Sequence, residues 1–321
     1  MRSSAFKIWL SIGTVATLYL LFQLFTEGNY KPHANQDLQY HIDQLDRVSF
    51  AGEPIPFDEP KKKRMLNREL NKIARHSTEM AILLKNAETW FPLIEPILKK
   101  KGIPEDFKYI AVVESNLTMN PVSRQGAVGF WQIIRGTATE FGLHINDEID
   151  ERYNPIKSTY AVCKFFNQTH TYFGSWTNAA ASYNMGMAAL IKACKRHKSN
   201  DYHDLKLNRE SSKYIYKILA FKEIIEHPEK YGLKKHPRTT RPKLIPIYVN
   251  KDIKDIVSWA KKKKIPLSVL KKFNPWIRAN SLTISDKHKQ YVILIPKYMP
   301  QVPKKTEPSK IENTDSSLVT K

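Results

Sequence analysis

The chain has 321 residues, of which 41% are hydrophobic, enough for a full-sized core and a smaller second unit. Its 52 basic residues against 31 acidic ones give a formal net charge of +21. Such an excess suits a polyanionic partner: nucleic acid, an acidic lipid surface or an acidic polymer. Only Cys163 and Cys194 are present, with no CxxC pair or Cys/His cluster at zinc spacing, which argues against a disulfide scaffold or a zinc module. We favour core packing of both cysteines over a single disulfide bond.

The N-terminus carries an apolar segment. Arg2 and Lys7 precede an uncharged run, IWLSIGTVATLYLLFQLF (8–25), which is just long enough to cross a hydrocarbon core at about 1.5 Å per residue. We predict an uncleaved signal anchor over 1–28 that holds the protein in the membrane, with the remainder on the periplasmic side of the cell envelope. A cleaved signal peptide is the alternative. Both imply export, which argues against a nucleic-acid partner.

The middle of the chain is predicted to be helical. Residues 29–60 are polar and contain several prolines, so we expect a tether there. One helix is expected from about Lys62 to Asn86, because apolar residues recur at spacings of three and four. Further helices are expected in the segments that open near Pro104, Asn154, Ser175 and Ser211. Since no alternating strand is evident between 62 and 232, we predict an all-helical domain over 61–235.

A different pattern follows the basic, proline-containing linker at 236–243. Two runs rich in β-branched and aromatic residues, 245–250 and 290–296, flank two short helical segments. This order predicts a compact α+β module, with strand, helix, helix and strand, over 244–298. The polar tail at 299–321 is predicted to be disordered. The fold class is therefore mainly α, with a small α+β module at the C-terminus.

One residue in DFKYIAVVESNL (106–117) is unexpected for its position. On a helix, Phe107, Ile110, Ala111 and Glu114 fall on one face at i, i+3, i+4 and i+7. Three of them suit a buried stripe, whereas a carboxylate is almost never fully buried without a partner. Either Glu114 reaches solvent at the edge of the stripe, or its partial burial has a purpose.

Several motifs follow Glu114 in a fixed order: ESNL (114–117), SRQGAVGFWQIIRGTA (123–138), AAASYNMG (179–186) and RESSKYI (209–215). Together they resemble the lytic murein transglycosylases with a goose-lysozyme-like catalytic domain, and most of all their membrane-bound D group. The resemblance covers roughly 80–232. It implies a lysozyme-like domain that cuts the β-1,4 bond between N-acetylmuramic acid and N-acetylglucosamine in peptidoglycan without water, leaving a 1,6-anhydro sugar, and that needs no metal or cofactor.

The same resemblance assigns roles to individual residues. It implies that Glu114 is the sole catalytic acid and then base. It also implies glycan contacts or support for Ser115, Ser123, Gln132, Tyr183, Asn184 and Tyr214. Gly126 and Gly129 are expected to allow tight turns, and we expect Trp131 in the core rather than as a sugar platform. Ser211 replaces the threonine usual in the last motif.

Partial burial would serve this chemistry. A general acid near neutral pH needs a carboxyl pKa above the ordinary value of about 4.3, and apolar surroundings raise it. Most glycosidases also need a second carboxylate, and the cluster NDEIDER (146–152) is interpreted as a polar connection instead. A hydrolytic muramidase and a catalytically silent wall-binding scaffold stay open as alternatives.

The C-terminal module resembles a LysM domain, which implies binding to peptidoglycan glycan strands. VILIP (292–296) fits the closing strand and PLSVLKKFNP (266–275) fits the second helix. The opening IYVNKDIKDIV (247–257) lacks the usual Gly-Asp-Thr, so a purely structural module is the alternative. The sequence names no protein partner.

Overall fold

The computed structural model describes residues 48–119, 121–233, 243–285 and 289–298. The predicted anchor (1–28), the first part of the tether (29–47), most of the linker and the tail (299–321) lie outside the described residues. No helix in the described ranges is long and apolar enough to cross a membrane.

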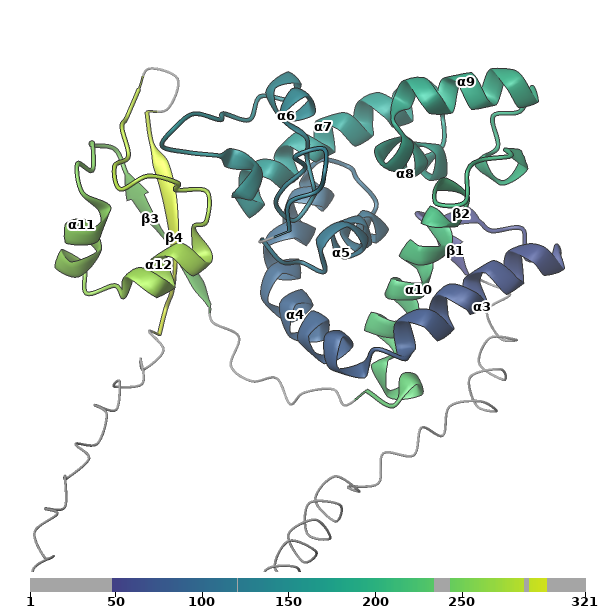
Figure 1. Cartoon of the computed structure of the whole chain (residues 1–321), viewed down its shortest axis with the longest axis horizontal. Helices are drawn as coiled ribbons and strands as arrows, with labels where there is room; N and C mark the ends of the chain where they lie inside the picture. The colour runs from purple at the N-terminus through teal and green to yellow at the C-terminus, as the bar shows by residue number, and fades with distance from the viewer. Residues whose placement is uncertain (1–47, 120, 234–242, 286–288, 299–321) are drawn as a thin grey trace, which may run out of the picture.

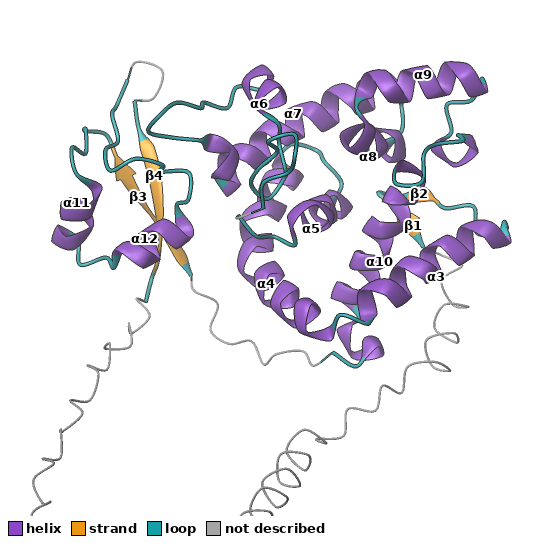
Figure 2. Ribbon diagram, in the orientation of Figure 1, coloured by secondary structure: helices purple, strands orange, loops and turns teal. Residues whose placement is uncertain are grey.

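Helices form most of the described chain, and strands are confined to two short antiparallel pairs in these ranges (Figure 2). The α-helices are α3 (Pro60–Ala74), α4 (Ser77–Lys100), α5 (Lys108–Ser115), α6 (Arg135–Glu140), α7 (Pro155–Phe173), α8 (Trp176–Met185), α9 (Met187–His197), α10 (Tyr214–Glu226), α11 (Ile256–Lys262) and α12 (Leu267–Phe273). The strands are β1 (Ser49–Phe50), β2 (Glu53–Pro54), β3 (Leu244–Val249) and β4 (Tyr291–Pro296), and short 3₁₀ turns occur at Glu105–Phe107, Glu151–Tyr153, Tyr202–Asp204, Ser211–Lys213 and Pro228–Tyr231.

The helical domain is assembled from pairs distant in sequence. α10 packs against α3 and α5, and α7 packs against α4 and α8 (Figure 1). The boundary of α7 follows from its caps: the Asn154 side chain accepts from two amides of the first turn, and Gly174 ends the helix at a left-handed φ of 69°. Cys163 and Cys194 are both buried and unbonded, in agreement with the prediction of core packing.

Two helix predictions need correction. The helix expected over Lys62–Asn86 is two helices, since α3 ends at Ala74 and α4 begins at Ser77. α4 continues to Lys100 through Pro92 and Pro96, with Trp90, Ile94 and Leu98 buried. Apolar packing on one face therefore outweighs the local cost of the prolines. The segment that opens near Ser175, expected to form one helix, is also divided, at Gly186, into α8 and α9.

Residues 48–59, which the sequence placed in the tether, are folded against the helical domain. Phe50 is completely buried and packs on Phe107 with ring centroids 5.4 Å apart. Glu53 accepts hydrogen bonds from the Trp176 and Thr177 amides at 2.6 and 2.8 Å, so a carboxylate covers the N-terminus of α8. The proline content of residues 48–59 suggested a tether, but the segment packs against residues more than fifty positions away in the sequence.

The C-terminal module has the predicted order. β3 and β4 pair antiparallel, with Leu244 opposite Pro296 and Val249 opposite Tyr291, and α11 and α12 lie between them in the chain. Its core contains Ile256, Leu270 and Ile293, all almost fully buried. This core also includes residues of the helical domain, so the module is packed against that domain and not only linked to it.

Candidate active site

α5 carries Glu114 as the sequence pattern predicted. Phe107, Ile110 and Ala111 are completely buried, which confirms the apolar stripe. Glu114 stands one residue before the end of the helix, and Asn116 adopts a left-handed conformation at φ 51°. The side chain is partly exposed, because one side of it opens to a cleft while protein atoms surround the rest.

Two adjoining cavities, of about 490 and 430 Å³, meet at Glu114. Residues common to both linings are Glu69, Lys72, Val113, Glu114 and Lys217. The remaining residues of the first, here called the charged half, are Asn184, Arg209, Glu210, Lys213 and Tyr214. The second, the apolar half, has a largely hydrophobic wall that includes Ile73, Met80, Leu83 and Phe221. Glu114 therefore lies near the middle of a cleft with chemically different ends.

The surroundings of Glu114 favour its protonated form. Burial is the largest influence and raises the carboxyl pKa, and the nearby charge of Glu210 raises it further. A hydrogen bond from Tyr214 and the charge of Lys217 act in the opposite direction, but the pKa remains above its ordinary value. This carboxyl therefore keeps its proton to a higher pH than an exposed glutamate does.

Two buried tyrosines lie close enough to this carboxyl to be influenced by its charge. The Tyr214 hydroxyl, from the start of α10, donates to Glu114 Oε1 at 2.6 Å. Burial, together with the charge of Glu114, raises the pKa of Tyr214 and of Tyr183 well above 10, so both remain neutral donors. The Tyr183 hydroxyl donates to the carbonyl of Trp131 instead of to the carboxyl. Tyr214 thus contacts the acid, whereas Tyr183 holds the neighbouring loop.

The hydroxyls of the two serines predicted to contact substrate form hydrogen bonds with backbone groups. Ser115 is buried, with Oγ 2.8 Å from the Phe130 carbonyl and 3.0 Å from that of Ala111. Ser123 Oγ accepts from the amides of Gln125 and Ala127 at 3.2 and 3.0 Å. Both side chains fix the backbone of the loop after α5, which corresponds to a supporting role.

Gln132 adopts an unusual backbone conformation, φ 46°, in the same loop. Its side-chain nitrogen, Nε2, donates to the carbonyls of Pro121 and Gly129 at 3.1 and 3.0 Å. It lines neither half of the cleft among the described residues. The nearby Trp131 is fully buried and donates to Thr159 Oγ1 at 3.0 Å, which agrees with the core position expected from the sequence.

Asn184, at the end of α8, lines the charged half. Its Oδ1 accepts from Ser211 Oγ at 2.9 Å, so the serine that replaces threonine retains the hydroxyl that this contact requires. The Asn184 amide nitrogen has no protein partner among the described residues and is available to a ligand acceptor. Of the predicted site residues, the cleft brings together Glu114, Ser115, Asn184 and Tyr214.

The cleft also contains a buried carboxylate that was not predicted from the sequence. Glu69, on α3, is only 6% exposed and lies 3.7 Å from Lys213 Nζ. It falls on the same helical face as Leu66, Leu70 and Ile73, and this single acidic residue in an apolar stripe was the available signal. Lys217, three residues after Tyr214 on α10, also faces the cleft and could have been found from helical spacing.

The acids of NDEIDER serve other contacts. Asp150 is paired with Arg152 at 2.7 Å, and Glu148 accepts hydrogen bonds from the C-terminal module. Neither lines the cleft among the described residues. This arrangement agrees with the interpretation of the segment as a connection.

Two known protein families match parts of the chain. Residues 92–206 match the family described as "Transglycosylase SLT domain", and residues 246–299 match "Soluble lytic transglycosylase C-terminal LysM-like domain". The chain therefore contains an SLT domain followed by a LysM-like domain. The SLT match includes Glu114, Gln132, Tyr183 and Asn184.

The chain is homologous to membrane-bound lytic murein transglycosylase D of Escherichia coli. It is 26% identical to the protein of strain K12 over 279 residues, which cover 85% of this chain and 61% of the relative. A putative tributyltin chloride resistance protein of Alteromonas sp. strain M-1 is 28% identical over 114 residues, covering 35% of this chain and 55% of that protein. The chain thus spans about three fifths of the length of these curated relatives.

Proposed function

We propose that the protein is a lytic transglycosylase that cleaves peptidoglycan at the β-1,4 bond between N-acetylmuramic acid and N-acetylglucosamine. The observation that carries the proposal is the position of Glu114, a half-buried carboxyl of raised pKa at the junction of the two halves of the cleft. The SLT domain and the homology to a murein transglycosylase support the same reaction.

In the first step, Glu114 acts as an acid. Its carboxyl gives a proton to the glycosidic oxygen as the bond between that oxygen and C1 of the muramoyl residue breaks. The Tyr214 hydroxyl, 2.6 Å from Oε1, then stabilises the carboxylate that forms. Burial keeps the proton on Glu114 before the reaction, and the tyrosine limits the cost of losing it.

In the second step, the same group acts as a base. The C6 hydroxyl of the muramoyl residue attacks C1, and its proton passes to the Glu114 carboxylate. The product is a 1,6-anhydro sugar, and the enzyme regains its starting protonation state without consuming water. One carboxyl suffices because the nucleophile belongs to the substrate.

The cleft offers groups suited to this polymer. The free Asn184 amide can donate to an acetamido carbonyl. Lys72, Arg209 and Lys217 supply positive charge that suits the carboxylates of stem peptides. We assign glycan binding outside the cleft to the LysM-like module.

Hydrolysis is the second candidate reaction, because Glu69 and Glu210 lie in the cleft with Glu114. Either could position a water for attack on C1. The ion pair between Glu69 and Lys213 favours a structural role for this carboxylate. The products distinguish the two reactions.

The test is digestion of purified peptidoglycan followed by mass spectrometry of the released muropeptides. A lytic transglycosylase leaves anhydro ends, each lighter by one water than the reducing ends that a muramidase leaves. We expect anhydro ends that disappear in Glu114→Gln and persist in Glu69→Gln. Reducing ends would replace this proposal with hydrolysis, and no release would leave a binding or scaffold protein.

We also propose that the protein acts in the cell envelope, anchored through residues 1–28. The membrane-bound homologue and the apolar run at 8–25 support this location. Fractionation of cells expressing the full chain should place it with the membranes, and protease added to spheroplasts should degrade the catalytic domain. Recovery in the soluble fraction after processing would indicate a cleaved signal peptide.

A further inference from the structure

Residues 146–153 of the helical domain contact the C-terminal module, and we call them the docking segment. Glu148 is bound through its side chain: Oε2 accepts from the Thr283 amide at 2.8 Å, and Oε1 from the hydroxyls of Ser281 and Thr283. The Glu148 carbonyl accepts from the Arg278 amide at 2.8 Å. These contacts fix the module by backbone as well as side chain.

Packing makes this junction a shared core. Ile149 is completely buried and forms an isolated antiparallel bridge with Ile277. Val128, Ile149 and Tyr153 of the helical domain lie in the same apolar cluster as Trp276 and other residues of the module. The Arg278 guanidinium lies 4.7 Å from the centre of the Tyr153 ring. A module that served only as a tethered binding unit would not need such an interface.

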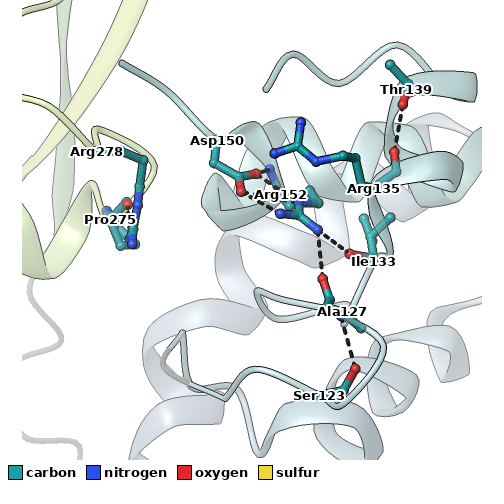
Figure 3. A network of polar contacts seen from close by, with 10 residues as sticks. Ser123, Ala127, Ile133, Arg135, Thr139, Asp150, Arg152, Pro275 and Arg278 are labelled. Atoms are coloured by element: carbon teal, nitrogen blue, oxygen red, sulfur yellow. Dashed lines mark hydrogen bonds and ion pairs between the residues drawn. The ribbon is translucent and has the colours of Figure 1, made fainter. Parts of the chain in front are cut away.

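The docking segment also contacts the loop that contains Gln132. Residues 126–133 are here called the active-site loop. The buried Arg152 binds Asp150 through two nitrogens, at 3.0 and 2.7 Å, and donates to the Ile133 carbonyl at 3.3 Å (Figure 3). It also donates to the Gly126 carbonyl at 2.8 Å. One guanidinium therefore fastens both ends of the loop to the docking segment.

The middle of the loop also touches the docking segment. A Cβ added at Gly129 would lie 2.1 Å from the Arg152 carbonyl, so the two backbones are in direct contact there. The Asp150 amide in turn donates to the Trp276 carbonyl of the module at 2.9 Å. Module, docking segment and loop thus form one continuous set of contacts.

On its other side, the loop contacts the end of α5 at Ser115, the residue that follows Glu114. Its Phe130 carbonyl lies 2.8 Å from Ser115 Oγ, and its Trp131 carbonyl accepts from Tyr183. The loop is therefore held between the end of α5 and the docking segment. A displacement of the docking segment would be transmitted to the backbone beside Glu114.

We propose that the LysM-like module is a positioning element for the active site. Its docking on Glu148 and on the backbone of the docking segment sets the active-site loop, through Arg152, against the end of α5. The role in catalysis rests on the proposed function, whereas the mechanical link from module to loop does not. Glu148 and Arg152 are positioning residues, because neither lines the cleft among the described residues.

Hydrogen exchange tests the link without any need for activity. The full chain is compared with Glu148→Ala and with Asp147→Ala, a matched control at the adjacent exposed carboxylate. We expect exchange of the amides in 126–133 to be about 10-fold faster in Glu148→Ala and unchanged in Asp147→Ala. Faster exchange confined to 276–283, or no change in either segment, would overturn the proposal.

Kinetics test the consequence for catalysis. On a soluble tetrasaccharide muropeptide, we expect Glu148→Ala and Arg152→Gln to lower kcat by about 10-fold with little change in KM, since misplaced groups reduce rate more than binding. Arg152→Lys should recover part of the loss. A module that only binds glycan predicts a loss confined to insoluble sacculi and expressed in KM, which would contradict the proposal. If the unaltered chain were inactive, the proposed function would fail while the exchange test remained valid.

Discussion

The cleft and the module junction each contain a central glutamate, and the pKa values of the two carboxyls are shifted in opposite directions. At Glu114, burial dominates and a single hydroxyl donates, so the carboxyl pKa is raised. At Glu148, the hydrogen bond from Ser281 dominates, Thr283 adds two donors, and the pKa is lowered. The balance between burial and hydrogen-bond donors therefore raises the pKa of one glutamate and lowers the pKa of the other.

The largest effect expected from this comparison is on catalysis. Glu114→Gln should lower the rate of muropeptide release by about 10³-fold or more, because an amide can neither give nor take the proton. Glu148→Gln changes the same chemical group, but because Glu148 only positions other residues the loss should be no more than about 10-fold. Release rates from purified peptidoglycan measure both, and similar losses in the two variants would remove the distinction between them.

The second largest loss of activity is expected when the hydroxyl that donates to Glu114 is removed. Tyr214→Phe should lower kcat by about 10- to 100-fold, since a hydrogen bond to a charged group contributes about 1.5–3 kcal/mol. The matched control is Tyr216→Phe on the same helix, whose hydroxyl contacts His203 and not the cleft. Equal losses in the two variants would indicate a general defect of α10.

The pH dependence of activity should follow the raised pKa of Glu114. The acid must be protonated to start the reaction, so kcat/KM should fall as pH rises through the pKa of this carboxyl in the free enzyme. Lys217 favours the charged form of Glu114, so Lys217→Met should move the alkaline limb of the pH–rate profile to higher pH. Tyr214→Phe should move it in the same direction. A limb that shifts to lower pH in either variant would show that another group controls it.

The smallest effect concerns stability, and it has opposite signs at the two sites. A raised native pKa stabilises the fold below the unfolded value of about 4.3, and this contribution is lost as pH rises through the native pKa. Glu114→Gln should therefore raise the melting temperature at neutral pH by roughly 2–4 °C per kcal/mol, and the gain should disappear in acid.

Glu148 should behave in the reverse manner. A lowered native pKa contributes stability that is present above the unfolded value and is lost as pH falls through the native pKa. Glu148→Gln should thus lower the melting temperature at neutral pH, with a smaller difference in acid. Calorimetry of both variants across this pH range measures the contrast, and shifts of the same sign would contradict it.

Sequence reasoning predicted the features that depend on near neighbours. The helical spacing of Phe107, Ile110 and Ala111 placed Glu114 beside an apolar stripe, and a helix begins after Asn154, as expected. The order of strands and helices in the C-terminal module was predicted for the same reason. Each of these signals acts within a few turns of the chain.

Other features depended on residues far apart and could not be predicted in this way. The break after Ala74 and the continuation of α4 through Pro92 follow from packing against other helices, which overrides local propensity. Phe50 belonged to a segment with the composition of a tether, yet its ring is completely buried. Ser115 and Ser123 were predicted to contact substrate from their motifs, and nothing in the sequence indicated that their hydroxyls also bond to backbone groups of the loop after α5.

The sequence by itself determined that a glutamate stands on the apolar face of a short helix, within an ordered set of motifs. Only the tertiary structure decided its protonation, because Tyr214 and Lys217 reach it from about 100 residues later in the chain. It likewise decided that Glu69 is buried in the cleft and that Glu148 holds the C-terminal module. Periodicity fixes the side of a helix on which a residue lies, whereas the balance of burial and hydrogen bonds around a carboxyl depends on the elements packed against that side.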